Sequence, residues 1–341
     1  NRIMREGKTQ APVWFMRQAG RYHTHYQNIR KNHGFMDMCK DSKLAHKITH
    51  GPLDEFDFDA AILFSDLLFP LEQIGMGLSY HSGPPTLELS LENLEDLKKL
   101  KTLDESESFY QFQHDAIKLL RNSMPEHKTL LGFVGSPFTL YSYAVEGAHK
   151  GNLNSTKLGL YDGRYQGFVE LIYQNLLEEM ITQAKGGADA ICLFDTACGE
   201  VDLQLFRKFL LPTIKNLTSD FKSKFPNKKI IYYSKMTNLN YLREIQDEHI
   251  DVLGIDWRQN ITEVLNELGS DYYIQGNLDP SLLFLPWENL ESEWLKLWRR
   301  VEQSTIGPSK WICGLGHGVL PKTPEENVRK SVNLIHQKMT Y

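Results

Sequence analysis

The sequence has few of the features that mark secreted, membrane-spanning or nucleic-acid-binding proteins. It contains 4 cysteines, without C-x-x-C spacing, so neither a disulfide framework nor a cysteine zinc site is indicated. No run approaches the about 18 consecutive apolar residues of a membrane helix, and the polar first residues are unlike a signal peptide. The formal net charge of -5 argues against a general nucleic-acid binder, whose phosphate contacts need an excess of basic residues.

These absences predict a reduced, cytoplasmic protein that binds neither membranes nor nucleic acid. The chain begins with asparagine rather than methionine, which leaves room for a removed leader. A hydrophobic content of 41% with 24% charged residues is ordinary for a globular protein and supplies ample material for a core. Any anion-binding site must therefore be local, because the chain as a whole is acidic.

Short apolar, β-branched runs alternate with longer segments of helical periodicity. Repeated strand-then-helix order predicts a parallel sheet, and eight such units close a (β/α)₈ barrel. An open doubly wound sheet is the competing architecture, but it would ordinarily carry a G-x-G-x-x-G turn, which this chain lacks. We predict a single-domain (β/α)₈ barrel over residues 1–341, with extra N-terminal and loop helices. The predicted strands are Pro12–Met16, Ala60–Phe64, Thr129–Val134, Ala190–Phe194, Lys229–Tyr233, Val252–Ile255, Tyr272–Gln275 and Trp311–Gly314.

Helix signals support this order. The apolar spacing over 166–185 predicts a long helix that ends at the glycine pair 186–187. A last helix is expected to start with Thr323 as its cap, Pro324 in its first turn and Glu326 completing a capping box. The long segment 75–128 is expected to hold extra helices, such as one over 91–100, and a small hairpin over 80–89.

Polar side chains follow each predicted strand, at the edge where barrel active sites are built. Polar residues flank most strands, so each one alone is explained by structure, whereas eight at one rim favour a site. They are Arg17 and Arg21, Ser65 and Asp66, Ser136, Asp195 and Thr196, Ser234 and Lys235, Asp256, Asn277, and His317.

Arg17 and Arg21 form an anion clamp in outline. Each guanidinium is permanently charged and matches a carboxylate or phosphate with two donors, although surface ion pairs explain such arginines equally well. Asp66 emerges from a buried strand and needs a donor or a cation, which suits either a helix cap or an active-site carboxylate. His317 lies between glycines, which let a ligand approach closely, and a structural histidine is the alternative.

Metal and triad chemistry have little support. His23 and His25 alternate as in a strand, but no second cluster of ligands lies nearby in the sequence. There is no G-x-S-x-G nucleophile elbow. We therefore expect no metal site and no Ser-His-Asp chemistry.

Five blocks of the sequence resemble the signature blocks of the uroporphyrinogen decarboxylase family. They run in the family's order along nearly the whole chain: Pro12-Val-Trp-Phe-Met-Arg-Gln-Ala-Gly-Arg-Tyr22, Phe64-Ser-Asp-Leu-Leu68, Gly135-Ser-Pro-Phe-Thr-Leu140 with Tyr143 and Glu146-Gly147, Gly276-Asn-Leu-Asp-Pro280, and Gly316-His-Gly-Val-Leu-Pro-Lys-Thr-Pro-Glu-Glu-Asn-Val328. The resemblance implies a (β/α)₈ barrel, usually a homodimer. It also implies that the four acetate side chains of uroporphyrinogen III are decarboxylated to give coproporphyrinogen III, without a cofactor.

The resemblance also assigns roles to residues. Arg17 and Arg21 would bind substrate carboxylates, with Gln18, Ala19 and Gly20 completing the substrate-binding loop. Asp66 would hold the pyrrole N–H groups. The side chains expected to line the cleft are Tyr143, Thr196 and His317. The catalytic candidates are Asp66, Arg17 and His317.

This chain departs from the family pattern at two places. Relatives usually follow Gly-Arg-Tyr with Leu-Pro-Glu, whereas here His23-Thr24-His25 intervenes. After the fifth predicted strand many relatives have a glycine-rich turn, whereas this chain has Lys235, which we leave out of the site.

Two other functions remain as alternatives. One is a zinc-dependent, corrinoid-linked methyltransferase of the same barrel superfamily, which would need a His-x-Cys and a further cysteine that this chain does not provide. The other is a non-catalytic tetrapyrrole- or anion-binding protein that kept the cleft.

Overall fold

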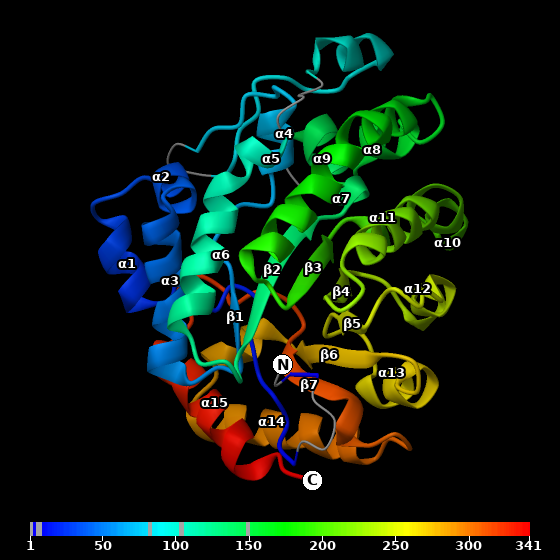
Figure 1. Cartoon of the computed structure of the whole chain (residues 1–341). Helices are drawn as coiled ribbons and strands as arrows, with labels where there is room; N and C mark the ends of the chain where they lie inside the picture. The colour runs from blue at the N-terminus through cyan, green and yellow to red at the C-terminus, as the bar shows by residue number, and fades with distance from the viewer. Residues whose placement is uncertain (1–2, 5–8, 81–83, 102–105, 148–150) are drawn as a thin grey trace.

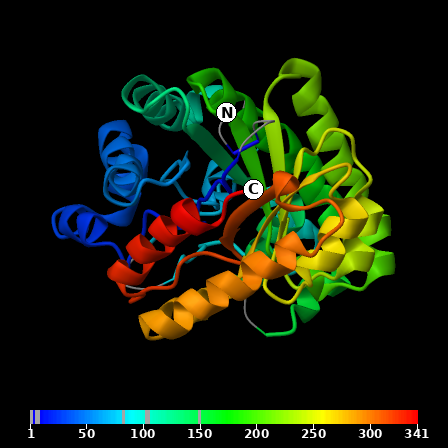
Figure 2. The ribbon, with the colours of Figure 1, turned by 90° about the horizontal axis from the view of Figure 1, so that it is seen from below.

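The computed structural model describes residues 3–4, 9–80, 84–101, 106–147 and 151–341. Its centre is a curled parallel sheet in the order β1-β2-β3-β4-β5-β6-β7, with helices outside it, as Figures 1 and 2 show. The strands are β1 Ala60–Ile62, β2 Thr129–Gly135, β3 Ala190–Asp195, β4 Lys229–Ser234, β5 Val252–Ile255, β6 Tyr273–Leu278 and β7 Trp311–Leu315. These seven confirm the predicted strands from 60–64 onward, with ends that differ by one to three residues.

The helices follow the strands as the periodicity predicts. The α-helices are α1 Thr24–Arg30, α2 Phe35–Lys40, α3 Ser42–Phe56, α4 Phe69–Gln73, α5 Ser106–Phe109, α6 Gln111–Ser123, α7 Pro137–Glu146, α8 Asn154–Leu158, α9 Arg164–Gly186, α10 Leu203–Leu205, α11 Leu211–Lys224, α12 Leu239–Ile245, α13 Ile261–Leu268, α14 Trp287–Glu302 and α15 Glu325–Lys338. Short 3₁₀ turns are η1 Leu94–Lys99, η2 Cys198–Glu200, η4 Pro280–Phe284 and η5 Pro308–Lys310, and η3 Phe206–Leu210 is a π-helical turn. None of the helices in the described ranges has both the length and the apolar character that a membrane span needs.

The first predicted strand, 12–16, is wrong as a regular strand. Only Val13 forms a bridge, to Cys313 of β7. On the other side the Val13 N–H donates to the Asp59 carboxylate at 2.7 Å, and the Asp59 N–H donates to the Val13 carbonyl at 2.9 Å. Because Pro12 has no N–H and Asp59 captures that of Val13, the segment lies between β7 and β1 without forming a regular ladder with either. The eight-stranded barrel is therefore not confirmed, and the structure has a seven-stranded, half-barrel sheet.

The sheet is buried on both faces, as its continuous apolar runs predict. Along β3 the alternate residues Ala190, Cys192 and Phe194 pack into a core inside the curl. Ile191 and Leu193 point the other way, into the larger core between sheet and helices. This alternation leaves the ends of the strands as the place where polar side chains emerge.

The local predictions had mixed outcomes. The long helix is confirmed as α9, which ends at Gly187 with a positive φ of 117°. The 91–100 helix is present as the 3₁₀ turn η1, and a Ser79–Thr86 bridge marks the start of the expected hairpin, part of which lies outside the described residues. The capping box at Thr323 is wrong, because its hydroxyl donates to the Leu320 carbonyl and α15 starts without a side-chain cap.

Candidate active site

A cavity of about 760 Å³ opens at the carboxyl ends of the strands. Its volume lies within the range usual for sites that hold a small molecule. Of the predicted site residues, those that line it are Arg17, Ala19, Gly20, Arg21, Asp66, Tyr143, Thr196 and His317. Side chains from the N-terminal loop, β1, α7, β3 and β7 thus meet around one space, although they are spread over 300 positions of the sequence.

The arginine loop, which carries Arg17 and Arg21, depends on two glycines, one from each end of the chain. Arg17 has a positive φ of 61°, which a non-glycine residue adopts only under constraint. A Cβ on Gly20 would lie 3.0 Å from the Arg17 carbonyl oxygen, and one on Gly318 would lie 2.5 Å from the Arg17 Cδ. Gly318 therefore makes room for the Arg17 side chain, and Gly20 makes room for the Arg17 carbonyl in the turn of the loop.

Gln18 does not reach the cavity. Its side chain is 1% exposed, its carbonyl accepts from the Phe15 N–H at 3.1 Å, and its amide donates to the Ala60 carbonyl at 2.8 Å. The Tyr22 hydroxyl donates to the Gln18 backbone carbonyl at 2.8 Å. The structure thus makes Gln18 a support of the arginine loop, tying it to the start of β1.

Asp66 follows β1 and faces the cavity. One carboxylate oxygen accepts from the Leu68 N–H at 2.7 Å, and the other accepts from the Tyr80 hydroxyl at 2.5 Å. Burial raises the pKa of Asp66, and the hydrogen bonds from Tyr80 and Leu68 together with the charge of Arg17 oppose that rise. The carboxylate is oriented from two sides and keeps lone pairs directed to the cavity.

His317 follows β7, and a backbone contact orients its ring. Nδ1 accepts from the Gly318 N–H at 2.7 Å, which favours the neutral tautomer with its proton on Nε2. The ring also meets Tyr233 edge to face, at 6.0 Å between centroids. In this tautomer Nε2 serves as a hydrogen-bond donor.

Tyr143 and Thr196 complete the predicted set. Tyr143 lies on α7, and burial raises its pKa. The Thr196 N–H donates to the Thr139 hydroxyl at 2.9 Å, which fixes the turn after β3. Both residues carry hydroxyl groups and line the cavity, and both lie far from the arginine loop in the sequence.

The described lining residues with polar groups that the predicted site leaves out are Tyr26, Arg30, Ser65, Tyr80 and Lys235. Lys235 follows β4 at a strand end, so its position in the sequence was a usable signal, although it was left out of the site. Burial, followed by the charge of Arg258, lowers its pKa. Arg30 lies at the end of α1 and Tyr80 in a long connection, and neither position carries a sequence signal for the cavity.

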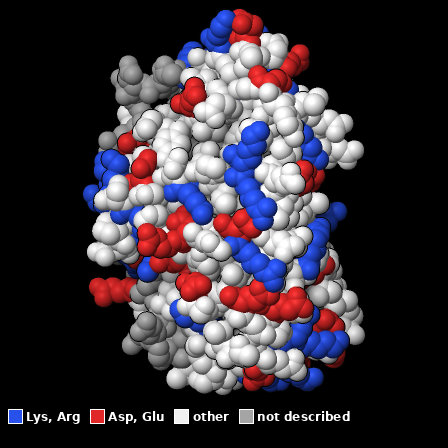
Figure 3. All heavy atoms as spheres, turned by 90° about the vertical axis from the view of Figure 1, so that its right-hand side faces the viewer, with Lys and Arg blue, Asp and Glu red and all other residues white. Residues whose placement is uncertain are grey.

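The cavity is strongly cationic. Arg17, Arg21, Arg30 and Lys235 line it, and Asp66 is the carboxylate among its described lining residues. Elsewhere the surface is mixed: on the face drawn in Figure 3, basic and acidic side chains are interspersed. The positive lining therefore selects a ligand with several acidic groups and one cationic or N–H-rich part.

The remaining candidates lie outside the cavity. His23 and His25 sit at the start of α1, not on a strand, and the His25 Nε2 contacts the Lys47 carbonyl at 2.9 Å. Neither histidine lines the cavity. The four cysteines are buried and unpaired, and burial raises the pKa of Cys192. None of them belongs to a metal-ligating group in the described part of the chain.

A curled parallel α/β sheet with a polar cavity at the carboxyl ends of its strands defines a barrel-like enzyme scaffold. Comparison with known proteins narrows this class. The model of the family "Uroporphyrinogen decarboxylase (URO-D)" matches residues 2–338. The chain is 35% identical to the uroporphyrinogen decarboxylase of Geobacter sulfurreducens, over 96% of this chain and 94% of the relative. It is 34% identical to that of Staphylococcus aureus, over 98% and 95%. The chain belongs to the uroporphyrinogen decarboxylase family.

A solved structure shares the fold at lower identity. A methyltransferase from Methanosarcina mazei superposes with a TM-score of 0.74 and 15% identity, covering 96% of this chain and 93% of the other. This likeness concerns the fold alone. The family match leaves the zinc-dependent methyltransferase alternative unfavoured.

Proposed function

We propose that this enzyme removes carbon dioxide from the four acetate side chains of uroporphyrinogen III and so produces coproporphyrinogen III. Membership of the uroporphyrinogen decarboxylase family supports this activity. The observation that carries it in the structure is the charge pattern of the cavity, where four cationic side chains surround the carboxylate of Asp66. A tetrapyrrole with carboxylates on its rim and N–H groups at its centre has the complementary pattern.

The reaction needs an electron sink. Loss of CO₂ from a pyrrole acetate would leave a carbanion beside an electron-rich ring, which accepts those electrons poorly. Protonation of a ring carbon first converts the pyrrole into an iminium-like cation. The C–C bond to the carboxylate then breaks, and its electron pair neutralises the cation and forms an exocyclic methylene. A second proton converts the methylene into a methyl group, and loss of the proton first added to the ring carbon restores the aromatic pyrrole. The substrate itself thus supplies the sink.

Asp66 would stabilise the cation as it forms. Its oxygens are held by Leu68 and Tyr80, so the carboxylate need not reorganise when the ring becomes positive. Burial raises the pKa of Asp66 because it disfavours the charged form, and a cationic neighbour stabilises that charged form. Among the lining residues it is the group suited to hold the pyrrole N–H groups.

The cations would anchor the rim of the macrocycle. Arg17 and Arg21 would bind substrate carboxylates with paired donors, and Ala19 and Gly20 let the ligand approach the loop backbone. Gln18 would act by fixing this loop, as its buried contacts indicate. Lys235, which follows β4, would be a further cationic anchor, and the family resemblance does not assign it that role. Tyr143 and Thr196 would contact the ligand with their hydroxyls.

Two groups are candidates for the proton donor. Arg17 lies where the substrate carboxylates would bind, and a guanidinium group is an inherently weak acid. His317 has an Nε2 proton in the tautomer that Gly318 favours, so it suits a donor or an orienting role. We propose Arg17 as a binder and proton donor, and His317 as the residue that orients the macrocycle or relays protons.

We also propose the finer features that the family resemblance implies. The enzyme would act as a homodimer in the cytoplasm, and 1–341 would form one decarboxylase domain. The segment 12–16 would occupy the eighth strand position of a closed barrel, and its hydrogen bonds to Cys313 and Asp59 support that role. Analytical ultracentrifugation of the full chain would measure its oligomeric state.

The direct test is incubation of the purified chain with uroporphyrinogen under reducing conditions, followed by oxidation and chromatography of the porphyrins. We expect species with seven, six and five carboxylates to appear and give way to the four-carboxylate product. Stoichiometric binding of the tetrapyrrole without product would instead establish a non-catalytic binding protein.

A further inference from the structure

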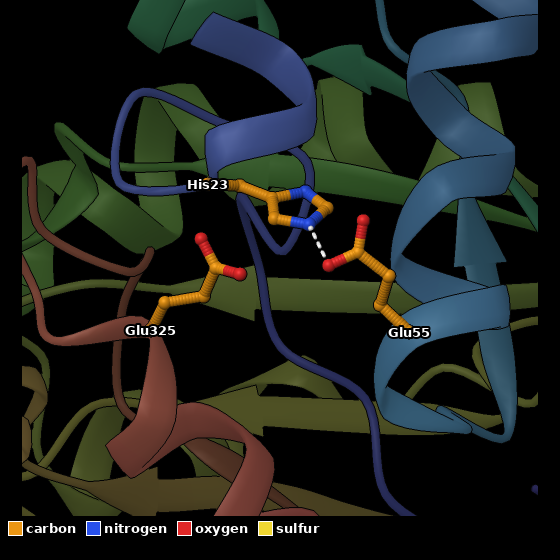
Figure 4. A group of neighbouring side chains, drawn as sticks. All are labelled: His23, Glu55 and Glu325. Carbon is orange, nitrogen blue, oxygen red and sulfur yellow. Dashed lines mark ion pairs between the residues drawn. The ribbon is translucent and has the colours of Figure 1, made fainter.

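Three potential metal ligands from distant parts of the sequence converge outside the cavity. His23 precedes α1, Glu55 lies in the last turn of α3, and Glu325 begins α15, and Figure 4 shows their side chains directed toward one another. One ligand atom from each lies within 4.8 Å of the other two. Nε2 of His23 is 3.0 Å from Oε2 of Glu55. None of the three residues lines the cavity.

His23 is the unusual member of this group. Its side chain is 0% exposed, yet neither ring nitrogen has a hydrogen-bond partner of acceptable geometry in the described part of the chain. Burying an imidazole in this way is unfavourable unless another interaction compensates. The contact with Glu55 is an ion-pair contact, and Figure 4 shows Glu325 on the other side of the ring.

We propose that His23, Glu55 and Glu325 form a site for a divalent zinc ion. An imidazole nitrogen and two carboxylate oxygens are a donor set that zinc accepts, with water as the fourth ligand. Zinc bonds of roughly 2.0–2.1 Å place tetrahedral ligand atoms about 3.4 Å apart, so small side-chain adjustments bring these three into position. The Glu55 and Glu325 side chains are 35% and 22% exposed, which gives an ion and its water a path from solvent.

Neighbouring groups prepare the carboxylates for this role. Oε2 of Glu325 accepts from the Thr24 N–H at 2.8 Å. Such supporting bonds orient metal ligands.

Arg329 competes with the ion without blocking it. Its guanidinium lies 3.9 Å from Oε2 of Glu55 and 3.6 Å from Oε1 of Glu325, beyond hydrogen-bond distance. A hydrogen bond of 2.6 Å to the Glu55 carbonyl and the face of the Phe56 ring hold it in place. Its positive charge lowers the affinity for zinc, so its removal should strengthen binding.

The site would act on the arginine loop. The loop runs directly into His23, which starts α1, so an ion here ties the segment that carries Arg17 and Arg21 to α3 and α15. The site is separate from the proposed decarboxylation, because none of its three residues lines the cavity.

The test uses the full chain after treatment with a chelator. Zinc is titrated in competition with a chromogenic chelator, and the melting temperature is measured with and without zinc. We expect one zinc ion per chain and a higher melting temperature in its presence. Removal of a residue that only supports a metal ligand costs about 10–100-fold in metal affinity. H23L and E55Q each remove a ligand itself, so the zinc affinity of each should fall by at least that much. R329Q should bind more tightly.

A matched control separates this site from adventitious binding. His46 and His50 lie one turn apart on α3, with ring centroids at 5.6 Å, and form a half-buried pair able to bind zinc weakly. H50Q should leave the tight site unchanged. If zinc does not bind saturably, or if binding survives in H23L, E55Q and E325Q but disappears in H50Q, the proposal is wrong.

Cobalt provides an independent readout. Cobalt bound by His23 and the two carboxylates should show visible d–d absorption without the near-ultraviolet charge-transfer band of a thiolate ligand. A strong thiolate band would place the ion at a cysteine and overturn the assignment. Because the readouts are affinity, stability and absorption, they are independent of whether the enzyme decarboxylates uroporphyrinogen.

Discussion

Two carboxylates near the carboxyl ends of β1 and β3, strands that β2 separates, differ in how far the protein encloses them. Asp66 follows β1 and opens to the cavity, whereas Asp195 ends β3 and is 0% exposed. Asp195 accepts from the Thr139 hydroxyl at 3.1 Å and from the Tyr232 hydroxyl at 2.9 Å. Burial raises the pKa of both, and hydrogen bonds oppose the rise in both. The Asp66 carboxylate is thus available to a ligand, whereas the Asp195 carboxylate is buried among hydrogen-bond donors of the protein itself.

This difference shows that a position at a strand end does not by itself make a residue functional. The internal donors around Asp195 come from α7 and β4, which pack against β3 and enclose it. At Asp66 the donors are a backbone N–H and Tyr80, which leave one side open to the arginine loop. Which neighbours enclose a strand end decides between structural and functional roles.

The largest expected effect is the loss of turnover in D66N. Removing one preorganised charged group from such a site typically costs about 10²–10³-fold in rate. D66N should keep its fold while kcat falls by that amount. The measurement is the rate of product formation, with circular dichroism as the check of folding.

D195N is the matched control for this prediction. It should lower the free energy of unfolding by about 1–3 kcal/mol, because a buried acceptor becomes a donor, while the folded fraction retains its kcat. If D195N lost turnover and D66N did not, the distinction between the two carboxylates would be refuted.

The next effect concerns the cationic side of the cavity. R17Q should weaken substrate binding, because it removes a charge-assisted hydrogen bond worth about 1.5–3 kcal/mol, or roughly 10–100-fold. With uroporphyrinogen as substrate, the lost binding should raise KM, and the loss of the proposed proton donor should also lower kcat. R243Q removes the same charge from a surface pair with Glu267 and should leave both constants unchanged. Equal effects of the two variants would show that net charge, not the clamp, controls binding.

A third buried carboxyl group sharpens the comparison through stability. Glu179 on α9 accepts from the Gln113 amide at 2.8 Å, and burial raises its pKa to about 8. The folded state therefore holds a proton that the unfolded state releases above its pKa of about 4.3. This contribution to stability is complete below about pH 4.3 and is lost as the pH rises toward 8, by at most about 1.4 kcal/mol per unit.

The variant E179Q isolates that contribution. Subtracting its free energy of unfolding from that of the parent chain should leave a difference that declines between pH 5 and pH 8. Denaturant unfolding at several pH values supplies the measurement. A difference that stayed constant over this range would show that Glu179 is ionised in the folded protein.

The smallest expected effect is a shift in the acidic limb of the activity profile. The Tyr80 hydroxyl lowers the pKa of Asp66, so Y80F should raise it. The active form needs the carboxylate, so activity in Y80F should begin to fall at a higher pH as the solution is acidified. The plot of kcat/KM against pH measures this, and a shift toward lower pH would contradict the assigned hydrogen bond.

Most of the sheet could be predicted from the sequence because parallel strands buried on both faces are continuous apolar runs. The segment 12–16 has the same appearance and is nevertheless not a regular strand. The reason is the carboxylate of Asp59, which takes the Val13 N–H that a ladder would use. Such competition between side chain and backbone depends on a residue 46 positions away and leaves no trace in local periodicity.

The site was predictable where residues follow strands and less so elsewhere. Arg17, Asp66 and His317 reach the cavity directly from strand ends or the adjoining loop. Tyr80 and Arg30 reach it because a long connection and a helix fold back over it, which no spacing predicts. Gln18 shows the converse, since its place in a signature block does not reveal that its side chain turns inward.

The most direct measurement counts the carbon dioxide released for each uroporphyrinogen consumed by the purified chain, with the substrate labelled in its acetate carboxyl groups. The cationic cavity with the opposing carboxylate of Asp66 predicts four molecules of CO₂ per tetrapyrrole at completion, and a rate that collapses in D66N. Binding of the tetrapyrrole without release of labelled CO₂ would contradict the account.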